Sequence, residues 1–240
     1  MIHLYTDFGL NGPYVGQMKS LIGDAGLSCT DLMHDAPRFR PVHAGYLLAA
    51  LHSHIPRGSI VIAVVDPGVG SDQRKPVIVE CDQRIYVGPG NELFNSLSQR
   101  YPNSQWHEIT DLPDSVSNTF HGRDIFTPVA IRLQLGESIS ALAKPMPAPV
   151  PQDWSVELDE VIYVDDFKNI WTGLSRHPKG DGGKIVFKNK GIPFASTFSD
   201  MKPGELFWYV NSSSLIEIAA NQGAASQLLK AQIGDRIEFE

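Results

Sequence analysis

The chain has 240 residues, of which 42% are hydrophobic and 20% are charged, and its formal net charge at pH 7 is −7. Its Lys and Arg residues form no basic block, which argues against nucleic acid as the main ligand, because a phosphate backbone is bound by clustered cations. Cys29 and Cys81 have no metal-ligand spacing. Two cysteines this far apart favour a reducing cytoplasm. No apolar run approaches the roughly 20 residues of a membrane span, so the sequence predicts an acidic, soluble protein without a membrane partner.

Residues 1–143 alternate between predicted strands and predicted helices. Ile2–Thr6 is a short apolar strand, and residues 59–65 form an apolar, mostly β-branched run, as expected for a strand buried on both faces of a parallel sheet. Residues 76–80 and 84–87 flank a short turn and predict a hairpin. Helical patterns lie at 14–23, 41–54, 91–100 and 125–135. The alternation predicts an N-terminal three-layer α/β domain with a largely parallel sheet.

A proline-rich segment at residues 144–154 separates two parts of the chain. Its alternate prolines favour extended polyproline geometry and cannot continue a helix or join a central strand, so we predict a semi-rigid linker. Residues 155–240 then carry short apolar or alternating runs separated by turn residues, with one helix-like segment at 224–230. Strands are predicted at 160–164, 183–188, 206–210, 215–219 and 236–239. This pattern predicts a smaller C-terminal β domain, either a sandwich or a barrel.

Polar residues follow the first predicted strand. Asp7 and Phe8 come directly after it, in a loop that glycines make adaptable. In an open parallel sheet, ligands bind beyond the carboxyl ends of the strands, where a carboxylate can accept two hydrogen bonds from a ribose diol. Asp7 can equally well cap the next helix, and the sequence leaves both roles open.

Two further segments place ionisable residues at such strand ends. Asp66 ends the most apolar strand, and a carboxylate there is costly unless it is paired; Arg74, eight residues on, is its natural partner. This pair is either functional or a structural ion pair that fixes the loop. His121 precedes a glycine and a predicted helix, and is either a site residue facing the same crevice or a surface histidine.

Several well-defined catalytic motifs are absent from the sequence. It contains no GxGxxG dinucleotide fingerprint and no GxxxxGK[ST] phosphate-binding loop. It also lacks the GxSxG elbow of serine hydrolases and the HExxH motif of zinc proteases. The sequence therefore does not predict any of these four kinds of site.

In the C-terminal domain, residues 164–171 read VDDFKNIW. Asn169 can hydrogen-bond an adenine edge while Phe167 or Trp171 stacks on the base, with Asp165 nearby. The same residues would also suit an Asx turn with core aromatics. The sequence alone does not decide between these interpretations.

Residues 210–221 read VNSSSLIEIAAN and place Ser212 and Glu217 around a predicted strand. Small hydroxyl groups at the start of a strand can hold a carboxylate or an ammonium group. Ordinary turn serines have the same pattern, so this assignment also has two interpretations.

Five motifs in the same order resemble those of the S-adenosylmethionine (SAM) hydroxide adenosyltransferase family. They are TDFG…YVGQMK, VVDPGVGS..R, TFHGRDIF.P.A, the V-D-x-F-x-N loop and N-S-S…EIA, and they span nearly the whole chain. These SAM hydrolases are related to the fluorinating and chlorinating SAM enzymes. The resemblance implies an N-terminal α/β domain, a C-terminal β-barrel-like domain and a homotrimer, with SAM between the N-domain of one subunit and the C-domain of its neighbour.

The resemblance also implies roles for residues of the N-terminal domain. Asp66, Arg74 and His121 match the family's Asp–Arg–His triad, which prepares the attacking water. Asp7 matches the carboxylate that holds the ribose diol, and Phe8 lies in the same substrate-binding motif. The halogenating relatives do not keep Asp and His at the triad positions, so this pairing favours hydroxide over halide.

Roles in the C-terminal domain follow in the same way. Asp165 matches the residue that holds the methionine amino group, Asn169 an adenine contact, and Ser212 and Glu217 ligand-contacting positions; Phe167 is expected at the base. The implied reaction is hydrolysis of SAM at C5′ to adenosine and L-methionine, with SAM as substrate and no cofactor or metal. The alternatives are a non-catalytic SAM or adenosine sensor and a SAM-dependent halogenase.

The chain departs from the family pattern at several loop positions. Gly12 stands where the family usually has Asp, and residues 89–92 read PGNE where the family usually has P-D-N-G. Lys168 and Ser214 replace frequent glycines. These departures concern the shape of the ligand pocket and leave the predicted triad intact.

Overall fold

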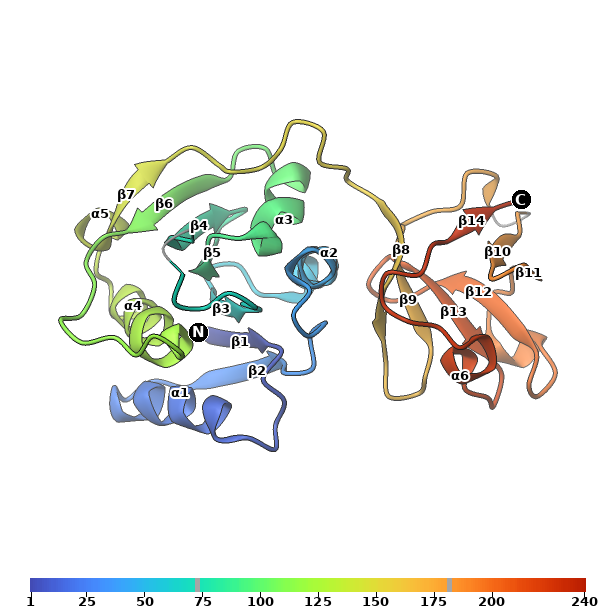
Figure 1. The fold of residues 1–240 in the computed structure, drawn as a ribbon, viewed down its shortest axis with the longest axis horizontal. Coiled ribbons are helices and arrows are strands. Elements are labelled where there is room, and N and C mark those ends of the chain that lie inside the picture. Colours follow the sequence, from blue (N-terminus) through green and yellow to red (C-terminus); the bar gives the residue numbers. More distant parts are fainter. Residues whose placement is uncertain (72–73, 181–182) are drawn as a thin grey trace. The chain divides into compact units, whose positions relative to one another are not determined.

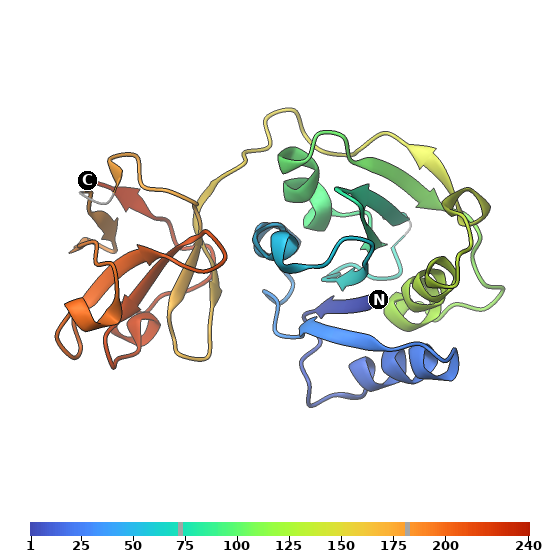
Figure 2. The same cartoon turned by 180° about the vertical axis from the view of Figure 1, so that it is seen from behind.

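The computed structural model describes residues 1–71, 74–180 and 183–240. The chain forms two compact units, Met1–Trp154 and Ser155–Glu240 (Figure 1; Figure 2). Each unit has a hydrophobic core of its own. The N-terminal unit takes in residues 144–154, the segment expected to be a linker.

A seven-stranded mixed sheet forms the centre of the N-terminal unit, in the order β2-β1-β3-β5-β4-β6-β7 (Figure 1). The pairings among β2, β1, β3 and β5 are parallel, whereas β4, β6 and β7 extend the sheet by antiparallel pairing. The α/β class is confirmed, and β4–β5 is the predicted hairpin. The strands are β1 (Ile2–Thr6), β2 (Cys29–Met33), β3 (Ile60–Val64), β4 (Pro76–Cys81), β5 (Arg84–Pro89), β6 (Gln105–Ile109) and β7 (Ala143–Met146).

Helices cover both faces of this sheet. Two of them, α1 and α2, begin at Pro13 and Pro41, because a proline fits the first helical turn, where its missing N–H is not needed. The α-helices are α1 (Pro13–Asp24), α2 (Pro41–Leu51), α3 (Asn95–Arg100), α4 (Thr127–Gln134) and α5 (Ile139–Leu142). Shorter turns are the 3-10 helices η1 (His52–His54) and η2 (Glu92–Phe94) and the π-helix η3 (Gly122–Phe126).

The side chains of β3 explain its continuous apolar sequence. Ile60, Ile62 and Val64 belong to the core that also contains residues of α1 and α4. Val61 and Ala63 belong to a second core that contains residues of α2 and α3. Since successive side chains of a strand point to opposite faces, β3 lies between two helical layers, as predicted.

The predicted linker begins inside the sheet. Residues 143–146 form β7, in which Pro145 faces His107 of β6. β7 is the last strand of the sheet, where a proline is tolerated because one edge of the strand needs no ladder hydrogen bonds. The prolines therefore exclude this segment from the centre of the sheet but allow it to form the last strand.

The C-terminal unit consists mainly of two antiparallel sheets, in the orders β12-β13-β9-β8 and β11-β10-β14. This confirms its predicted β character, although the two sheets form no closed barrel within the described residues. None of the helices described in the chain is long and apolar enough to cross a membrane. The elements are β8 (Leu158–Val164), β9 (Ile170–Gly173), β10 (Ile185–Phe187), β11 (Lys190–Ile192), η5 (Phe198–Asp200), β12 (Leu206–Val210), β13 (Ile216–Ala220), α6 (Ala225–Leu229) and β14 (Glu238–Phe239).

Candidate active site

The carboxyl ends of β1 and β3 meet at one edge of the N-terminal sheet, because the two strands are parallel neighbours with Thr6 opposite Val64. A cavity of about 130 Å³ lies there. The structure thus brings together three of the predicted site residues. The cavity is lined by Phe8, Tyr14, Val64, Asp66, Val69, Thr119, Phe120, His121 and Gly122.

Arg74 pairs with Asp66, through Nη1 and Oδ1, as predicted. Both side chains are largely buried, with 17% and 7% of their surfaces exposed. Burial lowers the pKa of Arg74, although a guanidinium remains charged at neutral pH. Gly68 makes room for this pairing, since a Cβ there would lie 2.8 Å from Arg74 Nη2.

His121 completes the predicted triad. It lines the main cavity beside Asp66 and shares a smaller adjoining space with both Asp66 and Arg74. Burial, followed by the charge of Arg74, lowers its pKa from the usual 6.5, and Asp124 acts in the opposite direction. The imidazole is therefore neutral at neutral pH and can accept a proton.

The segment that carries His121 is fixed by a local network. Asp124 accepts hydrogen bonds from the Ser117 amide at 2.9 Å and from Arg123 Nε at 2.5 Å. Arg123 Nη1 in turn donates to Gln17 Oε1 at 2.8 Å. The π-helix η3 starts directly after His121, and such irregular turns are often found at functional sites.

Asp7 lies after β1 as predicted, but it does not line this cavity. Its Oδ2 accepts a hydrogen bond from the Phe39 amide at 3.2 Å. Burial raises its pKa, against the lowering effects of this bond and of Arg38. The helix-capping alternative is wrong, because the residue at the N-cap of α1 is Gly12, with no side-chain capping bond.

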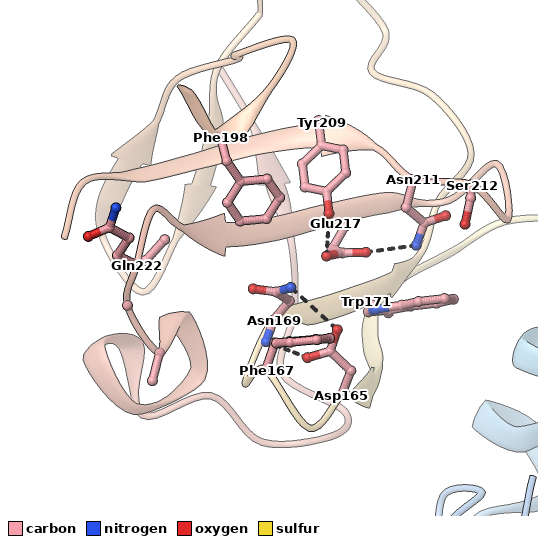
Figure 3. A pocket seen from close by; sticks show the side chains of 13 residues that line it. Asp165, Phe167, Asn169, Trp171, Phe198, Tyr209, Asn211, Ser212, Glu217 and Gln222 are labelled. Atoms are coloured by element: carbon pink, nitrogen blue, oxygen red, sulfur yellow. Dashed lines mark hydrogen bonds between the residues drawn. The ribbon is translucent and has the colours of Figure 1, made fainter. Parts of the chain in front are cut away.

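The C-terminal unit contains a larger pocket, of about 940 Å³ (Figure 3). All five residues predicted for the C-terminal domain line it, including both carboxylates. Four other lining residues were not predicted from the sequence, namely Phe198, Tyr209, Asn211 and Gln222. The lining residues are Asp165, Phe167, Asn169, Trp171, Phe198, Tyr209, Asn211, Ser212, Glu217, Ala220, Gln222, Gly223 and Ala224.

The turn between β8 and β9 supplies the first group of these side chains. Asp165 accepts hydrogen bonds from the Asn169 amide at 2.8 Å and from Asn169 Nδ2 at 3.3 Å (Figure 3). Asp165 thus stabilises its own turn and also lines the pocket, whereas the alternative expectation of core aromatics is wrong for Phe167. Phe167 is 79% exposed, and Lys168 has a φ of 69°, a conformation that favours glycine.

Glu217 lies on β13 and is only 3% exposed. Tyr209, directly opposite on β12, donates a hydrogen bond to its Oε1 at 2.5 Å, and Asn211 Nδ2 donates to Oε2 at 3.0 Å (Figure 3). Burial raises the pKa of Glu217, and these two hydrogen bonds oppose that shift. Knowledge of the register between β12 and β13 would have predicted Tyr209 as a site residue, because it lies directly opposite Glu217.

Ser212 lies in the turn between β12 and β13, beside Asn211. Asn211 Oδ1 accepts hydrogen bonds from the amides of Ser213 and Leu215, at 2.9 and 3.1 Å. Ser214, which replaces a frequent family glycine, has a φ of 59°. The two glycine replacements therefore both fall at left-handed positions.

The protein thus consists of two units. The α/β unit contains an Asp–Arg–His group, and the β unit contains a pocket lined by aromatic side chains and carboxylates. The chain belongs to the SAM hydroxide adenosyltransferase family: the model of the family's N-terminal domain matches residues 2–143, and that of its C-terminal domain matches residues 159–238. The predicted resemblance is confirmed.

Named relatives match along the full chain. The (R)-S-adenosyl-L-methionine hydrolase of Thermus thermophilus is 31% identical, over 97% of this chain and 96% of the relative. The protein of that name in Methanocaldococcus jannaschii is 29% identical, over 100% and 95%. The crystal structure of an uncharacterized conserved protein from Thermotoga maritima superimposes with a TM-score of 0.88 at 30% identity, covering 100% of this chain and 99% of that one.

Proposed function

We propose that this protein hydrolyses SAM to adenosine and L-methionine, and that, like its named relatives, it acts on the R epimer at sulfur. The observation that carries the proposal is the grouping of Asp66, Arg74 and His121 at the carboxyl edge of the sheet, where Asp66 and His121 line the main cavity and all three line the small adjoining space. The family and its named relatives favour a hydrolase over a sensor or a halogenase.

The proposed chemistry uses these three side chains. Water attacks C5′ of the adenosyl group, a C5′–O bond forms, and the C5′–S bond breaks with its electron pair passing to sulfur, which leaves as the thioether of methionine. His121 accepts the proton that the water loses and passes it to solvent. Arg74 stabilises the developing hydroxide, while Asp66 holds Arg74 and orients the water.

The remaining predicted residues are proposed to bind the substrate. In the N-terminal unit, Asp7 would hold the ribose diol and Phe8 would contact the substrate. In the C-terminal unit, Asp165 would hold the methionine amino group, Asn169 the adenine edge and Phe167 the face of the base. Ser212 and Glu217 complete that pocket.

We further propose that the protein is a homotrimer in which one copy supplies the N-terminal pocket and a neighbouring copy the C-terminal pocket. The proposal is supported by the location of the two pockets. The proposed hydrolytic groups lie in the N-terminal unit, whereas the larger aromatic pocket lies in the C-terminal unit. The cytoplasmic location stays a prediction from the sequence.

Product analysis tests the proposed function. The purified protein is incubated separately with (R)-SAM and (S)-SAM, with and without added chloride or fluoride, and the products are separated by liquid chromatography with mass detection. The expected result is adenosine and methionine, formed faster from (R)-SAM and unaffected by halide. A 5′-halogenated nucleoside would indicate a halogenase, and binding without turnover would indicate a sensor; either result contradicts the proposal.

A further inference from the structure

Three aromatic rings meet at the cavity that holds Asp66 and His121. Phe8 follows β1, Tyr14 lies in the first turn of α1, and Phe120 immediately precedes His121. Their ring centroids are 5.1–5.8 Å apart and their planes meet at 54–81°. Tilted and edge-to-face contacts of this kind are favourable for aromatic rings, and all three rings line the cavity.

The geometry of the proposed reaction places the sulfonium in the same cavity. The attacking water must lie beside Asp66 and His121, and reacting atoms are about 3 Å apart before bond formation. The sulfur is bonded directly to the carbon under attack. The positive charge of the substrate therefore enters a space of about 130 Å³ whose aromatic wall is Phe8, Tyr14 and Phe120.

Among the described residues, no unpaired carboxylate lines this cavity. Asp66 is its one lining carboxylate, and Arg74 neutralises it. His121 is neutral at neutral pH, so it adds no positive charge that would repel a cation. Among the described residues that line this cavity, the negative faces of the aromatic rings are then the remaining electrostatic complement to a cation.

Phe120 already makes such a contact within the protein. The guanidinium of Arg123 lies 5.4 Å from the centroid of its ring. An aromatic partner also suits the chemistry better than an anion would, because the positive charge on sulfur decreases in the transition state as the C5′–S bond breaks. A carboxylate would stabilise the sulfonium most strongly in the ground state, and this stabilisation would be lost on the way to the transition state. An aromatic ring stabilises the sulfonium more weakly, so its loss adds less to the barrier.

We propose that Phe8, Tyr14 and Phe120 form a recognition site for the sulfonium cation, by which the protein distinguishes SAM from neutral thioether nucleosides. The inference rests on the proposed function and adds two residues, Tyr14 and Phe120, to the substrate site. The selectivity comes from ring faces rather than from an ion pair.

The test compares two analogues that do not react. One is the nitrogen analogue of SAM, measured at a pH where its tertiary ammonium is protonated, and the other is S-adenosylhomocysteine, a neutral thioether. Their binding constants are measured by calorimetry for the wild type, Tyr14→Leu and Tyr14→Phe. Tyr14 is suitable because it is 46% exposed, so its truncation does not open the core.

In Tyr14→Leu, the preference for the cation should fall by about 2- to 5-fold, equivalent to about 0.5–1 kcal/mol for one cation–π contact, whereas Tyr14→Phe should keep it. Phe120→Leu provides a second variant, with its fold checked by circular dichroism. An unchanged preference in both leucine variants, with SAM hydrolysis intact in the wild type, contradicts this inference alone. A wild type that prefers the cation but releases no adenosine from SAM contradicts the proposed function alone.

Discussion

Arg74 reaches back over a glycine turn to pair with Asp66, just beyond the end of the fully buried strand β3. Both partners are largely buried, so each depends on the other for its charge to be tolerated there. His121 adjoins this pair in a neutral form. The relationship explains how a permanent positive charge and a proton acceptor can share one small cavity.

Arg74→Gln should lower kcat by about 10²–10³-fold, because the developing hydroxide loses its fixed positive charge. Steady-state kinetics with (R)-SAM measure the effect. Arg57→Gln is the matched control, since Arg57 is largely exposed, pairs with Asp82 outside the site, and such surface ion pairs contribute little. A kcat near that of the wild type in Arg74→Gln would make the buried pair a purely structural feature.

His121→Ala should lower kcat by about 10²–10⁴-fold, and the pH profile of the wild type should report the same group. A base must be neutral to accept a proton, so activity is present above its pKa and is lost as the pH falls through it. Since that pKa is lowered from 6.5, half-loss of kcat/KM should occur below pH 6.5. Half-loss well above pH 6.5 would contradict the assignment.

Asp124→Asn should move this acid limb to still lower pH, because the Asp124 charge raises the pKa of His121. The measurement is the pH profile of kcat/KM for the variant and the wild type. Asp114→Asn is a suitable control on the same stretch of chain, since Asp114 is exposed. A shift to higher pH in Asp124→Asn would contradict the proposed coupling.

Tyr209→Phe should destabilise the protein by about 1–3 kcal/mol, since it removes a hydrogen bond from a buried carboxylate. Burial raises the pKa of Glu217 from 4.5, so its ionisation costs stability as the pH rises from 4.5 through the raised value. Without Tyr209 that pKa rises further. The loss in Tm should therefore be larger at pH 7 than at pH 4.5, whereas Val210→Ala, at an exposed neighbour, should show little change at either pH.

Lys168→Gly should stabilise the protein by about 0.5–1 kcal/mol, because a non-glycine residue is strained at a φ of 69°. Thermal unfolding measures the gain. Lys168→Ala removes the same side chain but keeps the strain, so it should not stabilise. Equal Tm values for the two variants would show that the side chain, and not the backbone, governs stability at this turn.

The sequence was sufficient for elements whose pattern is local. The apolar run of β3 and the prolines that begin α1 and α2 are examples. It did not predict β2, where Thr30 and Asp31 are exposed, since an edge strand of this kind has no apolar pattern. β7 was missed because the alternate prolines of its segment favoured a polyproline linker, and an edge strand was not considered.

The residues of the candidate site likewise differ in whether a local sequence pattern predicts them. Asp66 was found because a polar residue directly after a buried parallel strand lies at the ligand-binding edge of the sheet, whereas His121 was found because it precedes a predicted helix within a family motif. Tyr209 was missed because it reaches the C-terminal pocket only through its pairing with Glu217 across two strands. The cluster around Tyr14 likewise depends on packing between distant segments, which no local pattern records.

Hydrolysis in ¹⁸O-labelled water tests the central claim most directly. If water activated by Asp66, Arg74 and His121 attacks C5′, each adenosine formed in a single turnover should carry one ¹⁸O atom in its 5′-hydroxyl group, and the methionine should carry none. Mass spectrometry with fragmentation of the ribose locates the label. Unlabelled adenosine, label in methionine, or methylthioadenosine as the nucleoside product would contradict the account.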